Sequence, residues 1–200
     1  MLCNDKTKLV QISIINKCEI ANLIEVHRGA LPDDVLPNLG VDVMTRYYDK
    51  VFLLQESQKA ILFGAYSQDR LVGFCCLLFE QISFLSIINF NTIRILFVIL
   101  ISNPLVLMKL ICQLVHSFPL LDNSSEIAYF AVSEGSRGQG VGRFLIKKCI
   151  EKSKKLNLKY VQTKTSNSQL YKFYVKCFSA NLLKEFHVGK IIYRVVNFQL

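Results

Sequence analysis

A glycine-rich segment between an apolar run and an amphipathic run limits the fold of this sequence more than any other feature. The segment is Arg137-Gly138-Gln139-Gly140-Val141-Gly142-Arg143; residues 127–132 before it are apolar, and residues 144–150 after it have helical spacing. We therefore expect a strand, a glycine-rich turn and a helix. Glycines let a backbone approach a ligand closely, and the first N–H groups of a helix are unpaired and lie at its positive end. The segment predicts a site for a phosphate or pyrophosphate, to which Arg137 and Arg143 add positive charge.

The spacing of the glycines excludes two common phosphate-binding loops. A P-loop would need a lysine and a hydroxyl residue after Gly140, and neither is present. A dinucleotide fingerprint would need a further glycine where Arg143 or Leu145 stands. The pattern that matches is Arg/Gln-x-x-Gly-x-Gly/Ala, with Arg137, Gly140 and Gly142 at its fixed positions.

Hydrophobic spacing and chain breakers predict the elements before this segment. Asn16 and Glu19 have the spacing of a capping box, and Pro32 and Pro37 are expected to break the chain. Residues 67–70 have the polar composition of a hairpin turn. The second helix should turn inward Val41, Met44, Tyr48 and Val51. The expected elements are a strand at 9–15, helices at 17–28 and 41–54, and hairpin strands at 60–66 and 71–77.

The elements after the segment follow from the same reasoning. The helix that begins there should bury Val141, Phe144, Leu145 and Cys149 and present lysines on its other face. A strand at 159–165 should follow, then a helix with an inner face of Leu170, Phe173, Tyr174 and Cys177. Two strands, at 181–188 and 190–196 around Gly189, close the chain.

This order of elements and the pattern of the glycine segment resemble the GCN5-related N-acetyltransferase (GNAT) superfamily. In that superfamily the same loop holds the pyrophosphate of acetyl-coenzyme A. A second match is Asn167 followed seven residues later by Tyr174, as in the superfamily phrase Asn-x-x-Ala-x-x-x-Tyr-x-x-x-Gly-Phe. Leu170, Phe178 and Ser179 depart from this phrase, which indicates a one-residue shift in the turn after the helix.

The resemblance implies an α/β (α+β) fold: a mixed, mostly antiparallel central sheet flanked by helices, in a single domain over residues 1–200. A minimal domain of this kind would not need the strongly apolar insertion at about 80–124. We expect it to form two helices, at about 87–101 and 104–117.

The apolar insertion does not have the pattern of a transmembrane helix. Arg94, Lys109 and the pair Asn103-Pro104 interrupt it before about 20 apolar residues have accumulated. The favoured interpretation is packing on the sheet or a homodimer contact. The alternative is peripheral contact with a bilayer or a lipid-linked substrate.

Composition limits the kinds of binding partner and the cellular compartment that we expect. A net charge of +9 suits an anionic partner, and the 52% hydrophobic content can fill a core. The seven cysteines are odd in number and include no Cys-x-x-Cys pair, which argues against a disulfide framework and a zinc site. We expect no metal, no nucleic-acid partner, no signal peptide and a cytoplasmic location, with the membrane periphery as the alternative.

Cofactor-binding roles follow from the anion argument and the resemblance. The loop residues Arg137, Gly138, Gln139, Gly140, Val141, Gly142 and Arg143 should hold acetyl-coenzyme A as co-substrate. The resemblance adds the backbone at Phe130, Ala131 and Val132 for the pantetheine arm, and Asn167 as a further cofactor contact.

Catalytic and acceptor roles follow from the resemblance and from the needs of acetyl transfer to an amine. Tyr174 is the candidate proton donor to the departing thiolate, although a core aromatic is the plain alternative. Glu126 is the candidate base, with Glu134 and His187 as alternatives. On the loop after the first helix, the residues expected to border the acceptor are His27, Asp33 and Asp34.

The sequence thus predicts an N-acetyltransferase that transfers an acetyl group to a primary amine in a direct ternary complex, since no cysteine or serine is placed as a covalent carrier. The alternative is a non-catalytic acyl-coenzyme A binding or membrane-surface module. The insertion is similar to that of some bacterial acetyltransferases associated with surface polysaccharides, which suggests an amino sugar among small-molecule acceptors.

Overall fold

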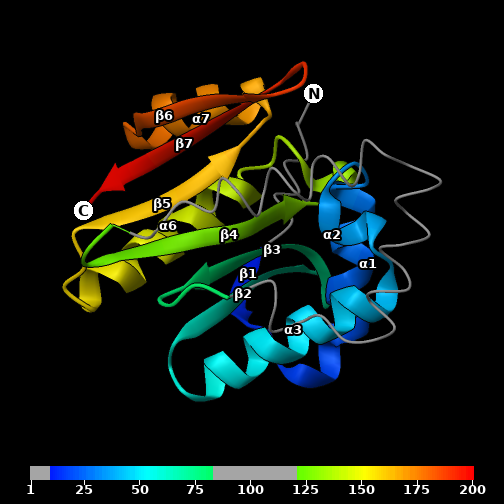
Figure 1. Ribbon diagram of the computed structural model, residues 1–200. Coiled ribbons are helices and arrows are strands. Elements are labelled where there is room, and N and C mark those ends of the chain that lie inside the picture. The colour runs from blue at the N-terminus through cyan, green and yellow to red at the C-terminus, as the bar shows by residue number, and fades with distance from the viewer. Residues whose placement is uncertain (1–9, 83–120) are drawn as a thin grey trace, which may run out of the picture.

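The computed structural model describes residues 10–82 and 121–200, which form a seven-stranded sheet with helices on both faces (Figure 1). The strand order is β1-β2-β3-β4-β5-β7-β6, and neighbouring strands are antiparallel except for β4 and β5. This confirms the predicted mixed, mostly antiparallel sheet. The strands are β1 Gln11–Ile14, β2 Ala60–Ser67, β3 Arg70–Leu78, β4 Ser124–Val132, β5 Tyr160–Thr165, β6 Asn181–Val188 and β7 Ile191–Gln199.

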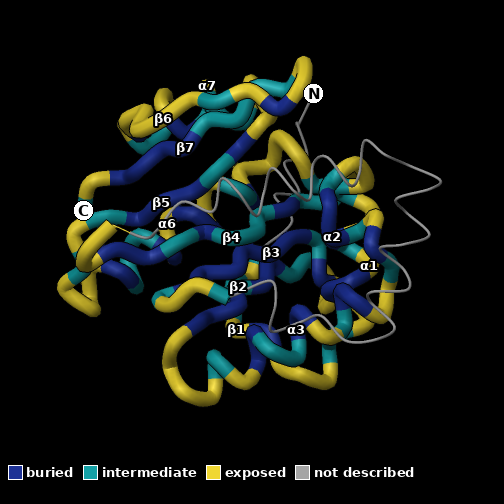
Figure 2. The backbone as a smooth tube through the Cα atoms, in the orientation of Figure 1, coloured by how far each residue is buried: buried dark blue, intermediate teal, exposed yellow. Residues whose placement is uncertain are grey.

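Helices cover the two faces of the sheet in two groups. One face carries α1 Ile20–Ala30, which follows the 3-10 turn Lys17–Glu19, then α2 Val35–Asn38 and α3 Val41–Glu56. The other face carries α6 Val141–Lys155 and α7 Ser168–Phe178. Two hydrophobic cores result, and Figure 2 shows buried residues concentrated in the strands between the helix layers.

Local signals placed most element ends correctly. The Glu19 carboxylate accepts a hydrogen bond from the Asn16 N–H (3.2 Å), as a capping box requires. The β2–β3 turn has positive φ at both Gln68 (52°) and Asp69 (60°), the geometry of a type I′ hairpin. Ser179 takes the left-handed conformation after α7, at φ 52°, so the turn residue comes one position after Phe178.

Three expectations about the helices were wrong. Pro37 does not break the chain but lies inside the short helix α2, because a proline in the first turn of a helix gives up no needed hydrogen bond. Val41 is 45% exposed, since the inward face of α3 begins at Val43 and Met44. Phe144 is 55% exposed, because α6 buries its face through residues Val141, Leu145, Ile146 and Cys149.

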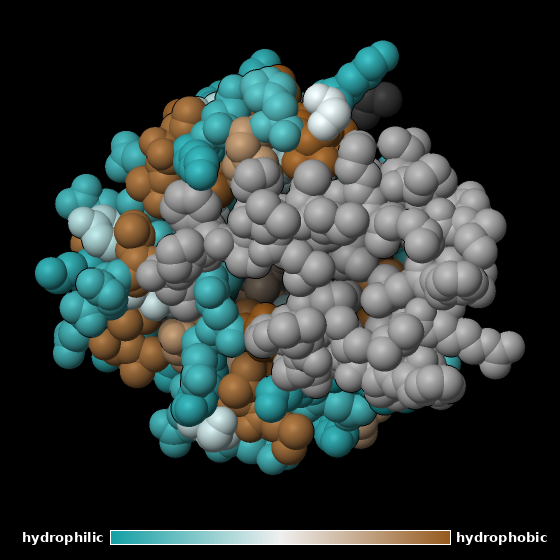
Figure 3. Space-filling model, viewed as in Figure 1, coloured by the Kyte–Doolittle hydropathy of each residue, from teal (hydrophilic) through white to brown (hydrophobic). Residues whose placement is uncertain are grey.

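The two apolar helices expected at about 87–101 and 104–117 lie outside the described residues. On the face seen in Figure 3, hydrophobic and hydrophilic residues of the described part are interspersed. Among the helices of the described ranges, none is long and apolar enough to cross a membrane.

Candidate functional site

The parallel strands β4 and β5 separate halfway along their length. Their pairing runs from Ser124 opposite Tyr160 to Ile127 opposite Thr163, and it ends there although β4 continues to Val132. Figure 1 shows the two arrows starting side by side and diverging toward their tips. The backbone of β4 beyond Ile127 therefore faces an opening in the sheet rather than a neighbouring strand.

A β-bulge in β4 lies where this opening starts. Cys76 is opposite Tyr129 and Leu77 is opposite Ile127, so Ala128 is the extra residue. The consecutive residues Ala128 and Tyr129 both pack toward the core under α1 and α3, whereas Ile127 and Phe130 pack toward α6. After the bulge, the alternation of β4 side chains between the two sides of the sheet is shifted by one residue. The sequence alone did not indicate this shift.

Backbone direction in β4 identifies the groups that point into the opening. The Ser133 N–H donates to the Val72 carbonyl of β3 at 2.8 Å. Because backbone groups alternate in direction along a strand, Ala131 also points toward β3, while Phe130 and Val132 point away from it. The N–H and C=O groups of Phe130 and Val132 are thus directed at the space between β4 and β5.

The glycine-rich loop leads from the end of β4 into helix α6. Gly138 and Gly140 have positive φ (76° and 80°), and Gly140 is the N-cap residue of α6. The first N–H groups of α6 lack intrahelical partners, and the loop from Arg137 to Gly140 is exposed. A Cβ on Gly142 would lie 2.8 Å from Cζ of Phe130, so any other residue here would require the Phe130 ring to shift. These features form a site where an anion can meet unpaired backbone donors.

Arg137 connects this loop to the end of α1. Its Nε donates to the Val132 carbonyl (3.1 Å) and its Nη2 donates to the Ala30 carbonyl (3.2 Å). The side chain thus ties the loop to the end of α1, and its positive charge remains because both partners are neutral carbonyls. Gln139 also holds the loop internally, because its Nε2 donates to the Gly135 carbonyl at 3.0 Å. Arg143 is exposed on the first turn of α6.

Tyr174 lies on the α6 side of the opening and is almost fully buried. Its ring packs against Phe198 (centroids 5.4 Å apart), Phe173 (5.9 Å) and Phe130 (6.5 Å). Burial raises the pKa of the Tyr174 hydroxyl, which therefore keeps its proton at neutral pH. The contact with Phe130 places this neutral phenol beside the β4 residue that borders the opening.

Asn167 has a structural task that its sequence position did not reveal. Its Oδ1 accepts hydrogen bonds from the N–H groups of Gln169 (2.9 Å) and Leu170 (3.0 Å), so it is the N-cap of α7. The cap fixes the start of the helix that carries Tyr174. Any cofactor contact by Asn167 would come in addition to this role.

Glu126 lies on β4 just before the opening, on the side of the sheet that faces α1. Burial raises the pKa of its carboxyl, and the nearby Lys164 and a hydrogen bond with Gln81 partly oppose the shift. Burial likewise lowers the pKa of Lys164, against the attraction of Glu126 and Asp34. Lys164 is on β5, with its Nζ 6.0 Å from the centroid of the Tyr193 ring. Lys164 and Tyr129 are neighbours of Glu126 that sequence reasoning missed, because the pairing of β4 with β5 brings Lys164 close and the bulge at Ala128 turns Tyr129 to the same face.

The three residues expected on the loop after the first helix separate in the structure. His27 is not on the loop but inside α1, fully buried, with Nδ1 2.6 Å from the Tyr48 hydroxyl oxygen. We grouped His27 with the loop because it is only a few residues before the loop in the sequence, but its position on the helix places its side chain in the core. Asp34 caps α2, since its Oδ1 accepts from the Val35 N–H at 2.7 Å, and Asp33 is exposed.

Asp34 is nevertheless close to the α1 side of the opening. Its charge raises the pKa of Tyr48 and of Tyr129, both of which are raised mainly by burial. Asp34, Glu126 and Lys164 thus form a charged group on the α1 side of the opening, beside the Tyr129 ring.

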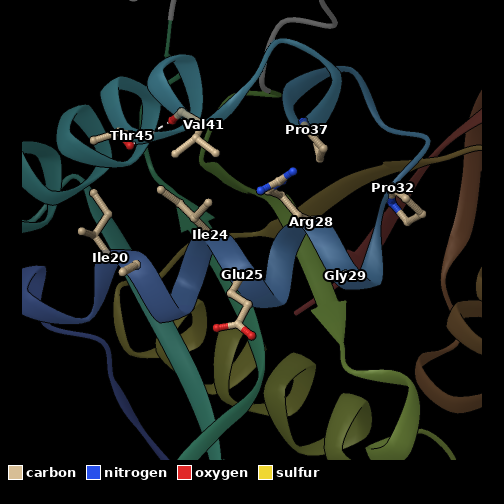
Figure 4. A pocket seen from close by; sticks show the side chains of 10 residues that line it. Ile20, Ile24, Glu25, Arg28, Gly29, Pro32, Pro37, Val41 and Thr45 are labelled. Atoms are coloured by element: carbon tan, nitrogen blue, oxygen red, sulfur yellow. Dashed lines mark hydrogen bonds between the residues drawn. The ribbon is translucent and has the colours of Figure 1, made fainter.

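The hollow in Figure 4 is a different feature. It has a volume of about 710 Å³ and lies on the outer side of α1, where Ile24 and Arg28 point toward Pro37 and Val41, and Glu25 points away. None of its lining residues belongs to β4, β5 or α6, so it does not contain the opening or the glycine loop. In the described ranges, no cluster of three or more histidine, cysteine or acidic residues has the arrangement of a metal site.

Comparison with known proteins agrees with this geometry. Residues 111–178 match the sequence profile of the acetyltransferase (GNAT) family. A PaiA N-acetyltransferase from Thermoplasma acidophilum in complex with coenzyme A is 12% identical with a TM-score of 0.63, over 96% of this chain and 99% of that one. The comparison with curated proteins gave no match.

Two further solved structures have the same fold. The ribosomal-protein-S18-alanine N-acetyltransferase from Escherichia coli is 10% identical with a TM-score of 0.60, over 96% of this chain and 94% of that one. A Bacillus subtilis acetyltransferase in complex with CoA is 16% identical with a TM-score of 0.52, over 96% and 97%. The fold is thus shared along the chain, while identities this low leave the acceptor open.

Proposed function

We propose that this chain, which carries an acetyltransferase domain of the GNAT family, transfers an acetyl group from acetyl-coenzyme A to a primary amine. The observation that carries the proposal is the opening between β4 and β5, which leads from the charged group at Glu126 to the glycine loop at the start of α6. One ligand that has both a diphosphate and a long amide-bearing arm suits this path. Acetyl-coenzyme A has both, and it would supply the acetyl group as an activated thioester.

The loop and β4 would bind this co-substrate through backbone donors. The N–H groups at the start of α6 suit the diphosphate, because they are unpaired and lie at the positive end of the helix dipole. The backbone groups of Phe130 and the N–H of Val132 suit the amide-bearing arm, because they point into the opening, whereas the Val132 carbonyl already accepts from Arg137. Arg137 would hold the loop in position through the carbonyls of Ala30 and Val132.

Glu126 would remove a proton from the acceptor amine. An amine attacks only as the free base, so the ammonium form must first lose a proton. Burial raises the pKa of Glu126, and a carboxylate with a raised pKa binds a proton more strongly than an ordinary surface glutamate. Lys164, whose charge opposes that shift, would favour the ionised form of Glu126, which is the form that accepts the proton.

Tyr174 would hold the proton that the departing sulfur needs. Its hydroxyl is protonated at neutral pH, as that of an ordinary tyrosine is, and the aromatic contacts with Phe130 and Phe198 position the ring. A neutral phenol in an apolar pocket can donate this proton without first binding one from solvent.

Direct transfer is favoured over a covalent acetyl-enzyme. Cys75 and Cys76 on β3 are fully buried, and burial raises the pKa of both thiols. A buried thiol with a raised pKa is a poor nucleophile because little thiolate forms. This supports attack by the amine itself while both substrates are bound.

Release of free coenzyme A thiol with a panel of amines tests the proposal. The panel should include amino sugars, aminoacyl amides, polyamines and simple alkylamines, with each amine omitted in turn as the blank. We expect amine-dependent thiol release for at least one class and an acetylated product of matching mass. Binding of acetyl-coenzyme A without release for any amine would instead favour a non-catalytic acyl-coenzyme A binding module.

A further inference from the structure

Two of the buried side-chain atoms that lack a hydrogen-bond partner lie next to each other on the sheet. They are Nε2 of Gln162 and Oδ1 of Asn197, which have no partner among residues 10–82 and 121–200 although their residues are only 4% and 6% exposed. Gln162 on β5 is opposite Asn197 on β7, and on its other side it is opposite Glu126 on β4. We call Glu126, Gln162 and Asn197 the polar row, because they cross three neighbouring strands in one line.

The polar row is on the same face of the sheet as the charged group at Glu126. Val161, Val196 and Phe198, the sequence neighbours of Gln162 and Asn197, pack into the core under α6. Since side chains alternate along a strand, Gln162 and Asn197 point to the opposite face. Lys164, two residues after Gln162, points to that face as well, which its contact with Tyr193 confirms.

The polar row lies at the closed end of the opening. The pair Glu126 and Gln162 is the last but one of the β4–β5 register, and the next pair, Ile127 and Thr163, ends it. If an acceptor has its amine at Glu126 and lies along the polar row, the rest of the molecule extends over β5 and then β7. Gln162 and Asn197 would then lie directly beneath it.

A buried N–H donor and a buried C=O acceptor without partners cost free energy, and a bound ligand that completes both is one explanation for keeping them. We propose that Gln162 and Asn197 bind a neutral hydroxyl or amide group of the acceptor, whose amine lies at Glu126. Both kinds of group accept one hydrogen bond, as Gln162 Nε2 requires, and donate another, as Asn197 Oδ1 requires. Alkylamines satisfy neither atom.

The strand spacing sets the size of this acceptor. Neighbouring strands are about 4.8 Å apart, so the amine and its hydroxyl or amide group are separated by about 5 to 10 Å. A hydroxylated amine such as an amino sugar and a short peptide amide both have this chemistry. The inference rests on the proposed acetyl transfer, and it narrows the acceptor class for that same site.

The test compares Gln162→Leu, Asn197→Leu and the double variant with Gln199→Leu, an exposed position on the same strand as Asn197. Each protein is assayed for thiol release with glucosamine, with alanyl-alaninamide and with hexylamine, which has neither a hydroxyl nor an amide. We expect the wild type to prefer glucosamine or the peptide amide, and the preferred one identifies the source of the polar group.

For the preferred acceptor we expect the double variant to lose at least about tenfold in kcat/KM. The leucine side chains cannot hydrogen-bond the hydroxyl or amide group of the acceptor, so that group no longer contributes to binding. The kcat/KM for hexylamine and the Kd for acetyl-coenzyme A should not change. The melting temperature should stay the same or rise, since leucine removes an unpartnered buried polar atom. Gln199→Leu should behave as the wild type.

Three results would overturn the inference. One is a wild type that prefers hexylamine, and another is an equal loss for all three amines in the double variant. The third is a lower melting temperature in both single variants with unchanged selectivity, because the two amides would then be partners of each other. Wild-type protein that binds acetyl-coenzyme A but acetylates no amine refutes the proposed function itself, and this result is distinct from a change in selectivity.

Discussion

The buried histidine of α1 predicts a specific loss of stability in acid. His27 is fully buried, and its Nδ1 is 2.6 Å from the Tyr48 hydroxyl oxygen. Burial lowers its pKa from 6.5 to about 3, because a charged imidazole would lose its hydration there. Its ring lies between those of Phe74 and Tyr129, which offer no compensating negative charge.

The direction of the pH dependence of stability follows from which state, folded or unfolded, binds the proton at His27. Between pH 6.5 and about 3 the unfolded chain binds a proton at His27 and the folded chain does not, so stability falls as the pH falls. Each pKa unit corresponds to about 1.4 kcal/mol, so lowering the pH from 7 to 5 removes about 2 kcal/mol through His27. The full loss approaches about 5 kcal/mol near pH 3, a large part of the stability of an ordinary domain.

Urea unfolding at pH 7 and pH 5 measures this effect in the wild type, His27→Leu and Tyr48→Phe. His27→Leu removes the titrating group, whereas Tyr48→Phe disturbs the same hydrogen bond and keeps the histidine. Both should be less stable at pH 7, but only His27→Leu should lose about 2 kcal/mol less than the wild type between the two pH values. Equal losses in all three proteins would show that His27 does not titrate as a buried group.

Two predictions concern the catalytic residues. Tyr174→Phe should lower kcat by about a hundredfold and leave the Kd for acetyl-coenzyme A unchanged, because it removes the hydroxyl group from a ring that stays packed. Tyr171→Phe on the same helix is the control. Full turnover in Tyr174→Phe would exclude Tyr174 as the proton donor. Glu126→Gln should flatten the acid limb of the pH profile of kcat/KM, since a base is lost as the pH falls through its raised pKa. An identical profile in wild type and Glu126→Gln would assign the base elsewhere.

Features set by neighbouring residues in the chain were predictable from the sequence. The hairpin turn at residues 67–70, the capping box at Asn16 and the glycine-rich start of α6 all depend on a few consecutive residues. The spacing from Asn167 to Tyr174 was also readable, and the structure places both on α7, one as its cap and the other on its buried face. The family resemblance came from these local patterns.

Features set by strand register were not predictable. The bulge at Ala128 decides that Ala128 and Tyr129 share one side of the sheet, and it depends on the pairing of β4 with β3. The approach of Lys164 to Glu126 depends on the parallel pairing of β4 with β5. The exposure of Phe144 depends on how α6 is seated on the sheet, which helical spacing alone does not fix.

Binding of acetyl-coenzyme A to the glycine loop is the central claim, and calorimetric titration of three proteins tests it most directly. Gly140 and Gly40 are both N-cap glycines with positive φ, at 80° before α6 and 93° before α3. Alanine at either position strains the backbone by about 1 to 2 kcal/mol, but only Gly140 lies in the loop.

We expect the wild type and Gly40→Ala to bind acetyl-coenzyme A equally well, and Gly140→Ala to bind about tenfold or more weakly. No heat of binding in the wild type, or the same Kd in all three proteins, would contradict the account.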